Sequence, residues 1–260
     1  MTYLRTAVIS GRLGYRALFA WNTPSLFVAS LLITPALQTV FFIALGNANG
    51  YGNPQFFVTG NAIQATAAAG VGGMVSVIAD ERRFGTLSAL LASPVPRTAV
   101  FVGRLIPGVA CGVIVSAVIS VLGFLFAGLP FPLENLGLYA FAVVIASLSC
   151  STLGLALSAF GLIYRDIYQL ATGIYLVMIV TSGANIAWSD LPAPLRWVGS
   201  VLPSGHAIEA IRSLHDSSRS DYWVLCGLEV GVALLWLATS LLLLRGLEQR
   251  ARATARVELS

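Results

Sequence analysis

The sequence predicts an all-α polytopic membrane protein with six transmembrane helices. Of its 260 residues, 57% are hydrophobic and 10% are charged, and the mean hydropathy is +0.84. A chain this apolar cannot cover its hydrophobic surface within one water-soluble core. Five long runs carry no charge, and a sixth contains only Glu229. Since a helix needs about 20 apolar residues to cross the hydrocarbon, we expect spans over residues 24–45, 55–79, 105–129, 135–164, 167–189 and 222–244.

The arginines predict the orientation of these spans. All 15 basic residues are arginine. If the N-terminus is cytoplasmic, twelve of them fall in inner segments, and only Arg196, Arg212 and Arg219 fall outside. Basic residues accumulate on the cytoplasmic side of membrane proteins, so we expect both termini in the cytoplasm. Arginines at the inner ends of the spans also account for the net charge of +4, so this charge does not indicate a nucleic-acid partner.

We expect one transmembrane domain over residues 1–260, consisting of a surface segment (1–23), a six-span bundle (24–244) and a cytoplasmic tail (245–260). Arg5, Arg12 and Arg16 share one face of the first segment, which suggests a helix lying along the inner surface. The outer segment 190–221 contains an uncharged run over 197–208, which is too short to span and is bounded by prolines. It predicts a re-entrant or interfacial helical hairpin.

Small residues recur every four positions on several expected spans, and such faces let helices approach closely. We expect them to pack within the chain rather than between subunits. They are Ala65, Ala69 and Gly73; Gly108, Gly112, Ser116 and Ser120; and Cys150, Gly154 and Ser158.

One short stretch of the sequence partly matches a known catalytic motif. The sequence Pro203-Ser204-Gly205-His206 is similar to the central motif of membrane phosphatidic-acid-type phosphatases. That pattern also requires a lysine and a later nucleophilic histidine, and neither is present here, so a membrane phosphatase is disfavoured. The three cysteines lack zinc-site spacing. Without lysine the chain cannot form a standard P-loop, so ATP chemistry must come from a partner.

The most informative stretch is the expected inner loop between the second and third spans. Phe84, Leu87 and Leu91 are spaced to share one helical face. Glu81 and Arg82 precede that face, and a Ser-Pro-x-Pro run follows it. The spacing predicts a short amphipathic helix parallel to the membrane. An ordinary basic anchoring loop would need only the arginines.

This loop resembles the pattern E-x-x-x-G-T-[LM]-x-x-L-L-x-[ST]-P-[VI]-x-R of ABC type-2 exporter permeases, including the daunorubicin-resistance-type permeases. The resemblance implies a cytoplasmic coupling helix that docks on an ATP-binding subunit. Leu202-Pro203 stands where many members have Asn-Pro, which is a departure from the family pattern. The residues implied in coupling are Glu81, Arg82, Arg83, Phe84, Gly85, Thr86, Leu87, Leu90, Leu91, Pro94 and Arg97.

The resemblance further implies two ATP-binding subunits, with ATP and magnesium bound there and no cofactor on this chain. It also implies a second permease, identical or homologous, in a bacterial cell membrane. A path with almost no charge favours export of a hydrophobic or amphipathic molecule, such as a drug, natural product or lipid-linked compound. A polysaccharide or lipid-linked glycan exporter and a non-transporting scaffold are the alternatives. Glu229 is a candidate substrate contact or a structural polar site within the membrane.

Overall fold

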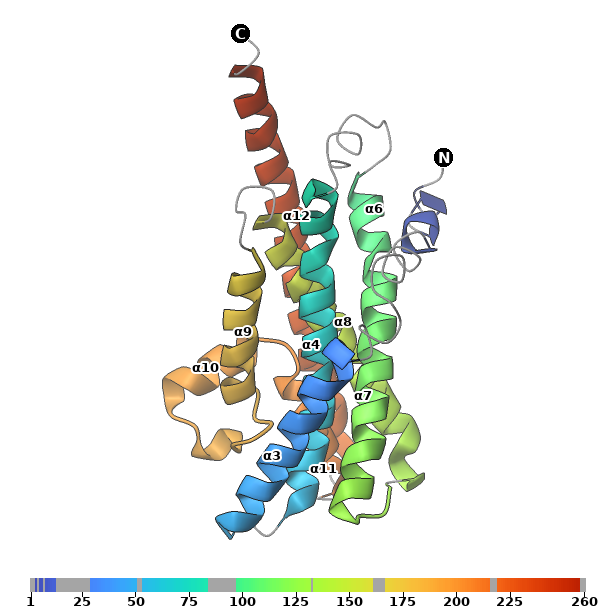
Figure 1. Ribbon diagram of the computed structural model, residues 1–260, viewed down its shortest axis with the longest axis vertical. Helices are drawn as coiled ribbons and strands as arrows, with labels where there is room; N and C mark the ends of the chain where they lie inside the picture. The colour runs from blue at the N-terminus through green and yellow to red at the C-terminus, as the bar shows by residue number, and fades with distance from the viewer. Residues whose placement is uncertain are drawn as a thin grey trace.

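The computed structural model shows a helical bundle elongated along its helix axes (Figure 1). It describes residues 3, 5–6, 8–12, 29–50, 53–83, 97–131, 133–160, 167–215 and 219–257. Every regular element within these ranges is a helix, which confirms the predicted all-α fold class. We call the end of the bundle at which α12 finishes the tail end. The opposite end, where Asn49 and Gly128 lie in turns, is the turn end.

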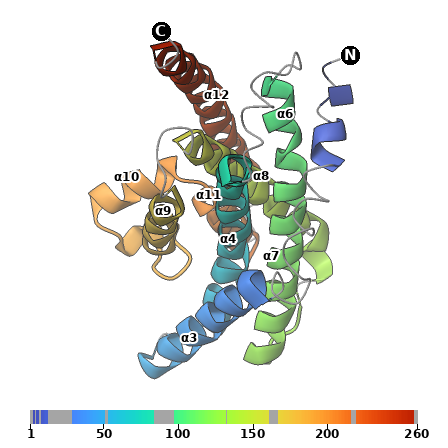
Figure 2. The same cartoon turned by 45° about the horizontal axis from the view of Figure 1, so that its top comes forward.

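Four long helices form the centre of the bundle. They are α4 (Pro54–Arg83), α7 (Leu105–Ala127), α8 (Leu136–Phe160) and α12 (Arg219–Val257). Helix α8 packs against α4 on one side and α12 on another, and α7 packs against α4 (Figure 2). The centre of the molecule is therefore built on α4 and α8, which most of the other helices contact.

Small residues bring these central helices together. A Cβ added at Gly154 of α8 would lie 2.7 Å from the carbonyl oxygen of Gly70 on α4. At Gly112 of α7, an added Cβ would lie 2.1 Å from Ser147 Oγ on α8. Both distances are shorter than van der Waals contact, so a larger residue at either position would require a neighbouring atom to move. The faces that contain Gly112 and Gly154 thus pack within the chain, as their spacing predicted, whereas a Cβ added at Gly73 of α4 would meet no atom within 4 Å.

Four helical stretches of the described residues are long and apolar enough to cross a membrane. They are Leu31–Ala48, Ala99–Ala127, Leu133–Phe160 and Arg219–Gly246. Helix α4 has 30 residues, about 45 Å at 1.5 Å per residue, but is less apolar. Its polar residues Asn61, Gln64 and Thr66 are buried against neighbouring helices. A helix that faces protein rather than lipid need not be apolar on every side, because protein partners satisfy its polar groups.

Two helices differ in length from the predicted spans. Helix α9 (Ile167–Thr181) has 15 residues, about 22 Å, whereas the uncharged run extends to residue 189. It ends two residues before Gly183, whose φ of 85° is incompatible with a continuing helix. Helix α12 instead continues through most of the predicted tail to Val257. Residues 245–257 are rich in Leu, Glu, Gln, Arg and Ala, which favour helix.

The remaining helices lie around this centre. A π-helical turn, η1 (Ala29–Ile33), leads into α3 (Thr34–Ala48), which packs on α4 and α7. Helix α6 (Arg97–Gly103) is separated from α7 only by Arg104. Residues 8–12 are helical, and Ser10 Oγ donates a hydrogen bond to the carbonyl of Val100 on α6 at 2.8 Å. A short 3-10 turn, η2 (Leu133–Asn135), precedes α8.

The segment before α12 forms the helical hairpin that the proline-bounded run predicted. It begins with η3 (Trp188–Asp190) and continues as α10 (Ala193–Val201) and α11 (Gly205–His215). Helix α10 lies against α9, away from the centre, whereas α11 packs against α12, α8 and α4. The two arms of this hairpin, α10 and α11, therefore contact different helices, and α11 is the arm that reaches the centre of the bundle.

Candidate functional site

The two described ends of the predicted coupling segment, the end of α4 and the start of α6, lie at the tail end of the bundle. Glu81, Arg82 and Arg83 form the last turn of α4, and Arg97 begins α6. We expected Glu81 and Arg82 to start a separate helix; instead they continue α4, because nothing in their sequence interrupts a helix. Phe84, Gly85, Thr86, Leu87, Leu90, Leu91 and Pro94 lie outside the described residues. The last residue of α4 and the first residue of α6 lie at the same end of the bundle (Figure 1).

Glu229 lies in the first third of α12 and is completely buried. Its carboxylate accepts hydrogen bonds from the hydroxyl of Ser149 on α8 and from the backbone N–H of Ser204, the latter at 2.8 Å. The backbone N–H groups of His206 and Ala207 also face it. These groups belong to the first turn of α11, where backbone N–H groups have no partners within the helix and favour negative charge. Glu229 therefore joins α12, α8 and the start of α11.

Ser204 forms the turn between the two arms of the hairpin. Its φ of 77° is the only positive value among described residues other than glycine, and its side chain is completely buried. The Ser204 hydroxyl donates a hydrogen bond to Gln64 Oε1 on α4 at 3.0 Å. Its backbone and side chain thus bind Glu229 and Gln64 respectively, and these contacts connect the turn to two central helices.

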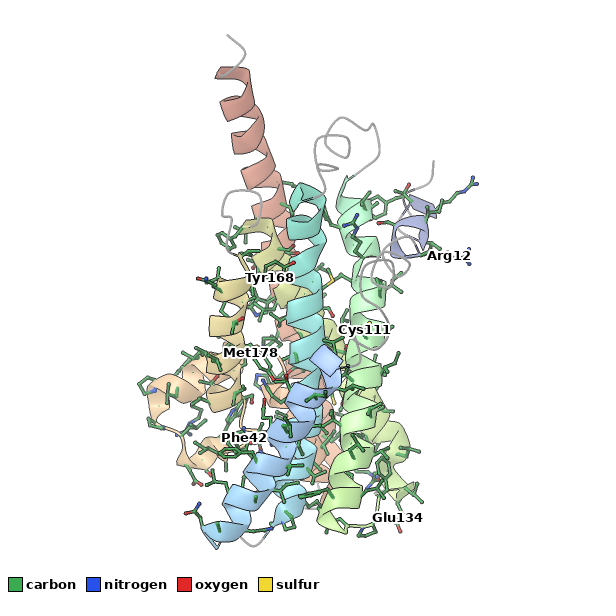
Figure 3. The ribbon with its side chains drawn as sticks, in the orientation of Figure 1. Arg12, Phe42, Cys111, Glu134, Tyr168 and Met178 are labelled. Atoms are coloured by element: carbon green, nitrogen blue, oxygen red, sulfur yellow. The ribbon has the colours of Figure 1, made fainter. Side chains whose placement is uncertain are left out.

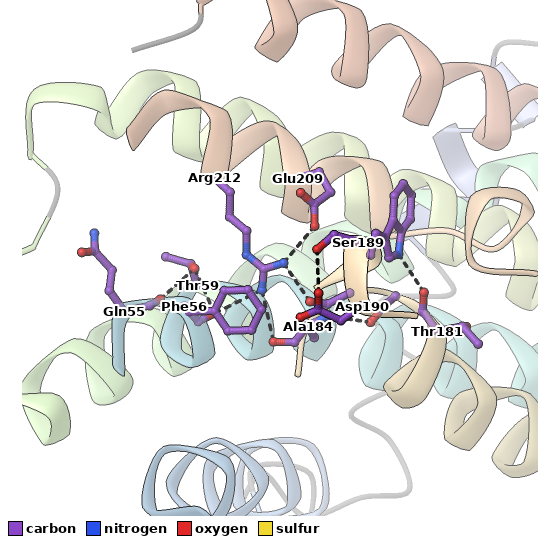
Figure 4. Close-up of polar contacts among 12 residues, drawn as sticks. Gln55, Phe56, Thr59, Thr181, Ala184, Ser189, Asp190, Glu209 and Arg212 are labelled. Atoms are coloured by element: carbon purple, nitrogen blue, oxygen red, sulfur yellow. Dashed lines mark hydrogen bonds and ion pairs between the residues drawn. The ribbon is translucent and has the colours of Figure 1, made fainter. Parts of the chain in front are cut away.

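Arg212 on α11 holds the loop that follows α9 (Figure 4). Its guanidinium donates to the carbonyl oxygens of Gly183, Ala184 and Phe56 at 2.8, 3.2 and 3.3 Å. It also pairs with Glu209 at 2.9 Å and lies 3.6 Å from the centre of the Phe56 ring. Burial lowers the pKa of Arg212, and the charge of Glu209 opposes that shift. Arginine remains charged at neutral pH, so this site is a charged clamp.

His206 and Trp188 complete the hairpin. Their rings meet edge to face, with centroids 5.0 Å apart. His206 Nε2 lies 3.0 Å from the carbonyl of Ser200, and Trp188 Nε1 donates to the carbonyl of Thr181 at 2.9 Å. Burial lowers the pKa of His206, so its imidazole is neutral at neutral pH and donates this bond. His206, the histidine of the phosphatase-like tetrapeptide, thus packs against Trp188 and donates a hydrogen bond to a carbonyl in the last turn of α10.

A chain of side-chain hydrogen bonds crosses the turn-end half of the bundle. Tyr175 on α9 donates to Gln38 on α3, at 3.1 Å, and Gln38 donates to Asn61 on α4, at 3.0 Å. Asn61 donates in turn to Asn185, in the loop after α9, at 2.8 Å. This chain fixes the positions of α3, α4 and α9 relative to that loop.

A cavity of about 590 Å³ opens beside this chain, between α3 and the loop after α9. Its lining is mostly apolar and includes aromatic side chains of α3 and α4. Four polar residues also line it, namely Asn49, Asn53, Asn185 and Asp190. Its size lies within the usual range for small-molecule sites, and a mostly apolar lining with a few polar groups is typical of them.

The fold is that of a multi-pass membrane protein whose buried polar groups connect helices to one another. No cluster of His, Cys, Asp and Glu suited to a metal ion occurs among the residues that the structure describes. The sequence model of the ABC-2 type transporter family matches residues 15–215, most of the chain, and the chain belongs to that family. This family membership confirms the resemblance seen in the sequence.

Two curated proteins are similar to part of the chain. The probable multidrug ABC transporter permease YbhR of Escherichia coli strain K12 is 26% identical over 151 residues. The alignment covers 56% of this chain and 40% of that protein. The protein of the same name from Escherichia coli O157:H7 matches with the same values. The chain therefore spans less than half the length of these relatives.

The sequence did not reveal several of these residues. The arginine distribution indicates only that Arg212 lies in an outer segment, and no local pattern points to Gln64 or Ser149. The proline, serine and glycine over 203–205 are a recognisable signal for a turn followed by a helix start. A buried carboxylate such as Glu229 must have partners, but the sequence does not say which residues supply them.

Proposed function

We propose that this chain is the permease subunit of an ATP-driven exporter that moves a hydrophobic or amphipathic molecule out of the cytoplasm or inner leaflet. Two ATP-binding subunits would supply the hydrolysis, and a second permease, identical or homologous, would complete the path. The termini would lie in the cytoplasm of a bacterium. The observation that carries this proposal is the family membership together with the coupling pattern over residues 81–97.

The position of the pattern supports the coupling role. It connects α4, the helix at the centre of the bundle, to α6 and α7. A displacement of the segment would therefore act on α4 and on the α6–α7 pair together, and coupling requires an element that both sites can bias. Phe84 and Leu87 would fill an apolar groove on the ATPase, and Arg82 or Arg83 would pair with acidic groups at its rim.

The permease should be coexpressed with a candidate ATP-binding subunit from the same organism, and both should be purified through a tag on the permease. We expect the Phe84→Ala/Leu87→Ala double variant to lose most of the ATPase or to hydrolyse ATP without export. Leu133→Ala/Leu136→Ala is the matched control, because both leucines are exposed at the turn end. Full association and full export by the coupling variant would show that the assignment is wrong.

A further inference from the structure

Two side chains that meet at the Ser204 turn each have one polar atom left unpaired. Ser204 contacts Glu229 Oε1 through its backbone N–H at 2.8 Å and Gln64 Oε1 through its hydroxyl at 3.0 Å. Glu229 and Gln64 are both completely buried. Glu229 Oε2 and Gln64 Nε2 make no hydrogen bond with the residues that the structure describes. Because one small residue contacts both side chains, the two unpaired atoms belong to the same buried region.

Unpaired polar atoms of this kind are unfavourable. A buried polar group without a partner has lost its hydrogen bonds to water and gained none in return, and the loss is larger for a charged group. Turning over the Gln64 amide does not remove the problem, because an amide has one donor end and one acceptor end and the Ser204 hydroxyl contacts only one of them. The two atoms therefore require a partner that the described side chains do not supply.

The groups around the two atoms fit a water molecule. Gln64 Nε2 is a donor and Glu229 Oε2 is an acceptor, and water can pair with both kinds of group. The backbone N–H groups of His206 and Ala207, which face the same carboxylate, are further donors. Several donors pointing into one site disfavour a metal cation there. Buried waters typically make about three hydrogen bonds to polar groups that have no other partner.

We propose that an ordered water is bound between Gln64 and Glu229 at the Ser204 turn. It accepts a hydrogen bond from Gln64 Nε2 and donates one to Glu229 Oε2. This water links α4 to α12, which packs mainly against α8 and α11. Glu229 lies ten residues from the start of α12, about 15 Å along the helix, so the water lies within the span. The proposal does not rest on the exporter function, because binding of the water needs neither an ATPase nor transport.

Radiolytic oxidation can detect this water, since hydroxyl radicals formed from a trapped water oxidise the side chains beside it. Cys226 is the reporter, because it lies one turn before Glu229, packs in one cluster with Ala207 and is only 3% exposed. Cys111 on α7 is the reference (Figure 3). It packs in a different cluster and is 8% exposed. The permease should be purified alone in detergent and irradiated with short X-ray pulses, and oxidation of each cysteine should be measured by mass spectrometry.

Bulk water alone would oxidise the more exposed Cys111 faster. We expect Cys226 to be oxidised faster than Cys111, and we expect Gln64→Leu to remove this excess because it removes one partner of the water. Gln38→Leu is the matched control, since it is the same substitution in a glutamine of α3 whose partners lie on α4 and α9. It should keep the excess.

The proposal is overturned if Cys111 is oxidised faster than Cys226 in the wild-type protein, or if the two leucine variants behave alike. The wild-type comparison remains decisive even if Gln64→Leu does not fold. Both results are obtained without an ATPase, so they leave the exporter function untested.

Discussion

The carboxylate of Glu229 accepts a hydrogen bond from the backbone N–H of Ser204 at 2.8 Å, and this bond joins the first third of α12 to the start of α11. A carboxylate buried in a membrane protein is unfavourable unless polar groups surround it. Here the first turn of α11 and the Ser149 hydroxyl supply those groups. The same carboxylate caps a helix whose N-terminal N–H groups would otherwise be buried without partners.

The geometry predicts that Glu229 stabilises the hairpin. Replacing Glu229 by Ala should lower the stability of the protein by about 2–4 kcal/mol, because it leaves buried donors unpaired. Glu229→Gln keeps an acceptor oxygen and should cost less. Thermal unfolding in detergent, with hydrogen exchange over residues 202–207, measures both effects. Unchanged stability and exchange in Glu229→Ala, with altered cargo selectivity, would instead identify Glu229 as a substrate contact.

Arg212 should be irreplaceable by lysine. The guanidinium reaches Gly183, Ala184 and Phe56 with a planar fork of donors, which a lysine ammonium cannot reproduce. We expect Arg212→Lys to destabilise the protein by about 1–3 kcal/mol and to increase hydrogen exchange over residues 182–187.

Arg196→Lys serves as the comparison for Arg212, because Arg196, which lies on α10, donates a 3.5 Å hydrogen bond to the carbonyl of Leu191 just before that helix. Its stability should match the wild type. Equal stability of the two lysine variants would contradict the clamp described for Arg212.

The orientation of the bundle can be tested by cysteine labelling. The twelve-to-three distribution of arginines predicts that the tail end lies in the cytoplasm and the turn end outside. An Asn49→Cys variant should react with an impermeant maleimide added to intact cells, and Ser88→Cys should react only after permeabilisation. Cys111, Cys150 and Cys226 are all buried, so the background should be low. The opposite labelling pattern would reverse the orientation.

How far the sequence predicted this structure depends on the interaction concerned. The all-helical fold, the four stretches that are long and apolar enough to cross a membrane, and the hairpin follow from the lengths of apolar runs and the positions of prolines, which are local signals. Arg212 could not be placed in this way, because the carbonyl groups that it binds lie 28, 29 and 156 residues away in the chain. The same holds for Gln64 and Ser204, which are 140 residues apart. Hydrogen bonds across the bundle depend on how the helices pack, and no local pattern encodes them.

The last prediction concerns the packing of α8 on α4. Alanine favours helix over glycine by about 1 kcal/mol, so Gly→Ala within α8 should stabilise the protein wherever there is room. At Gly137 an added Cβ meets no atom within 4 Å. At Gly154 it would lie 2.7 Å from the Gly70 carbonyl oxygen and 2.9 Å from the Cα of Val71. Both are backbone atoms, which cannot move aside without shifting α4.

Gly137→Ala should therefore leave stability equal or slightly higher, whereas Gly154→Ala should lower it by about 1–3 kcal/mol through overpacking. Because the two substitutions are chemically identical and lie on the same helix, their difference isolates the contact between α4 and α8. Thermal unfolding of both variants in the same detergent measures it. Equal unfolding temperatures would mean that α8 does not approach α4 as closely as described here.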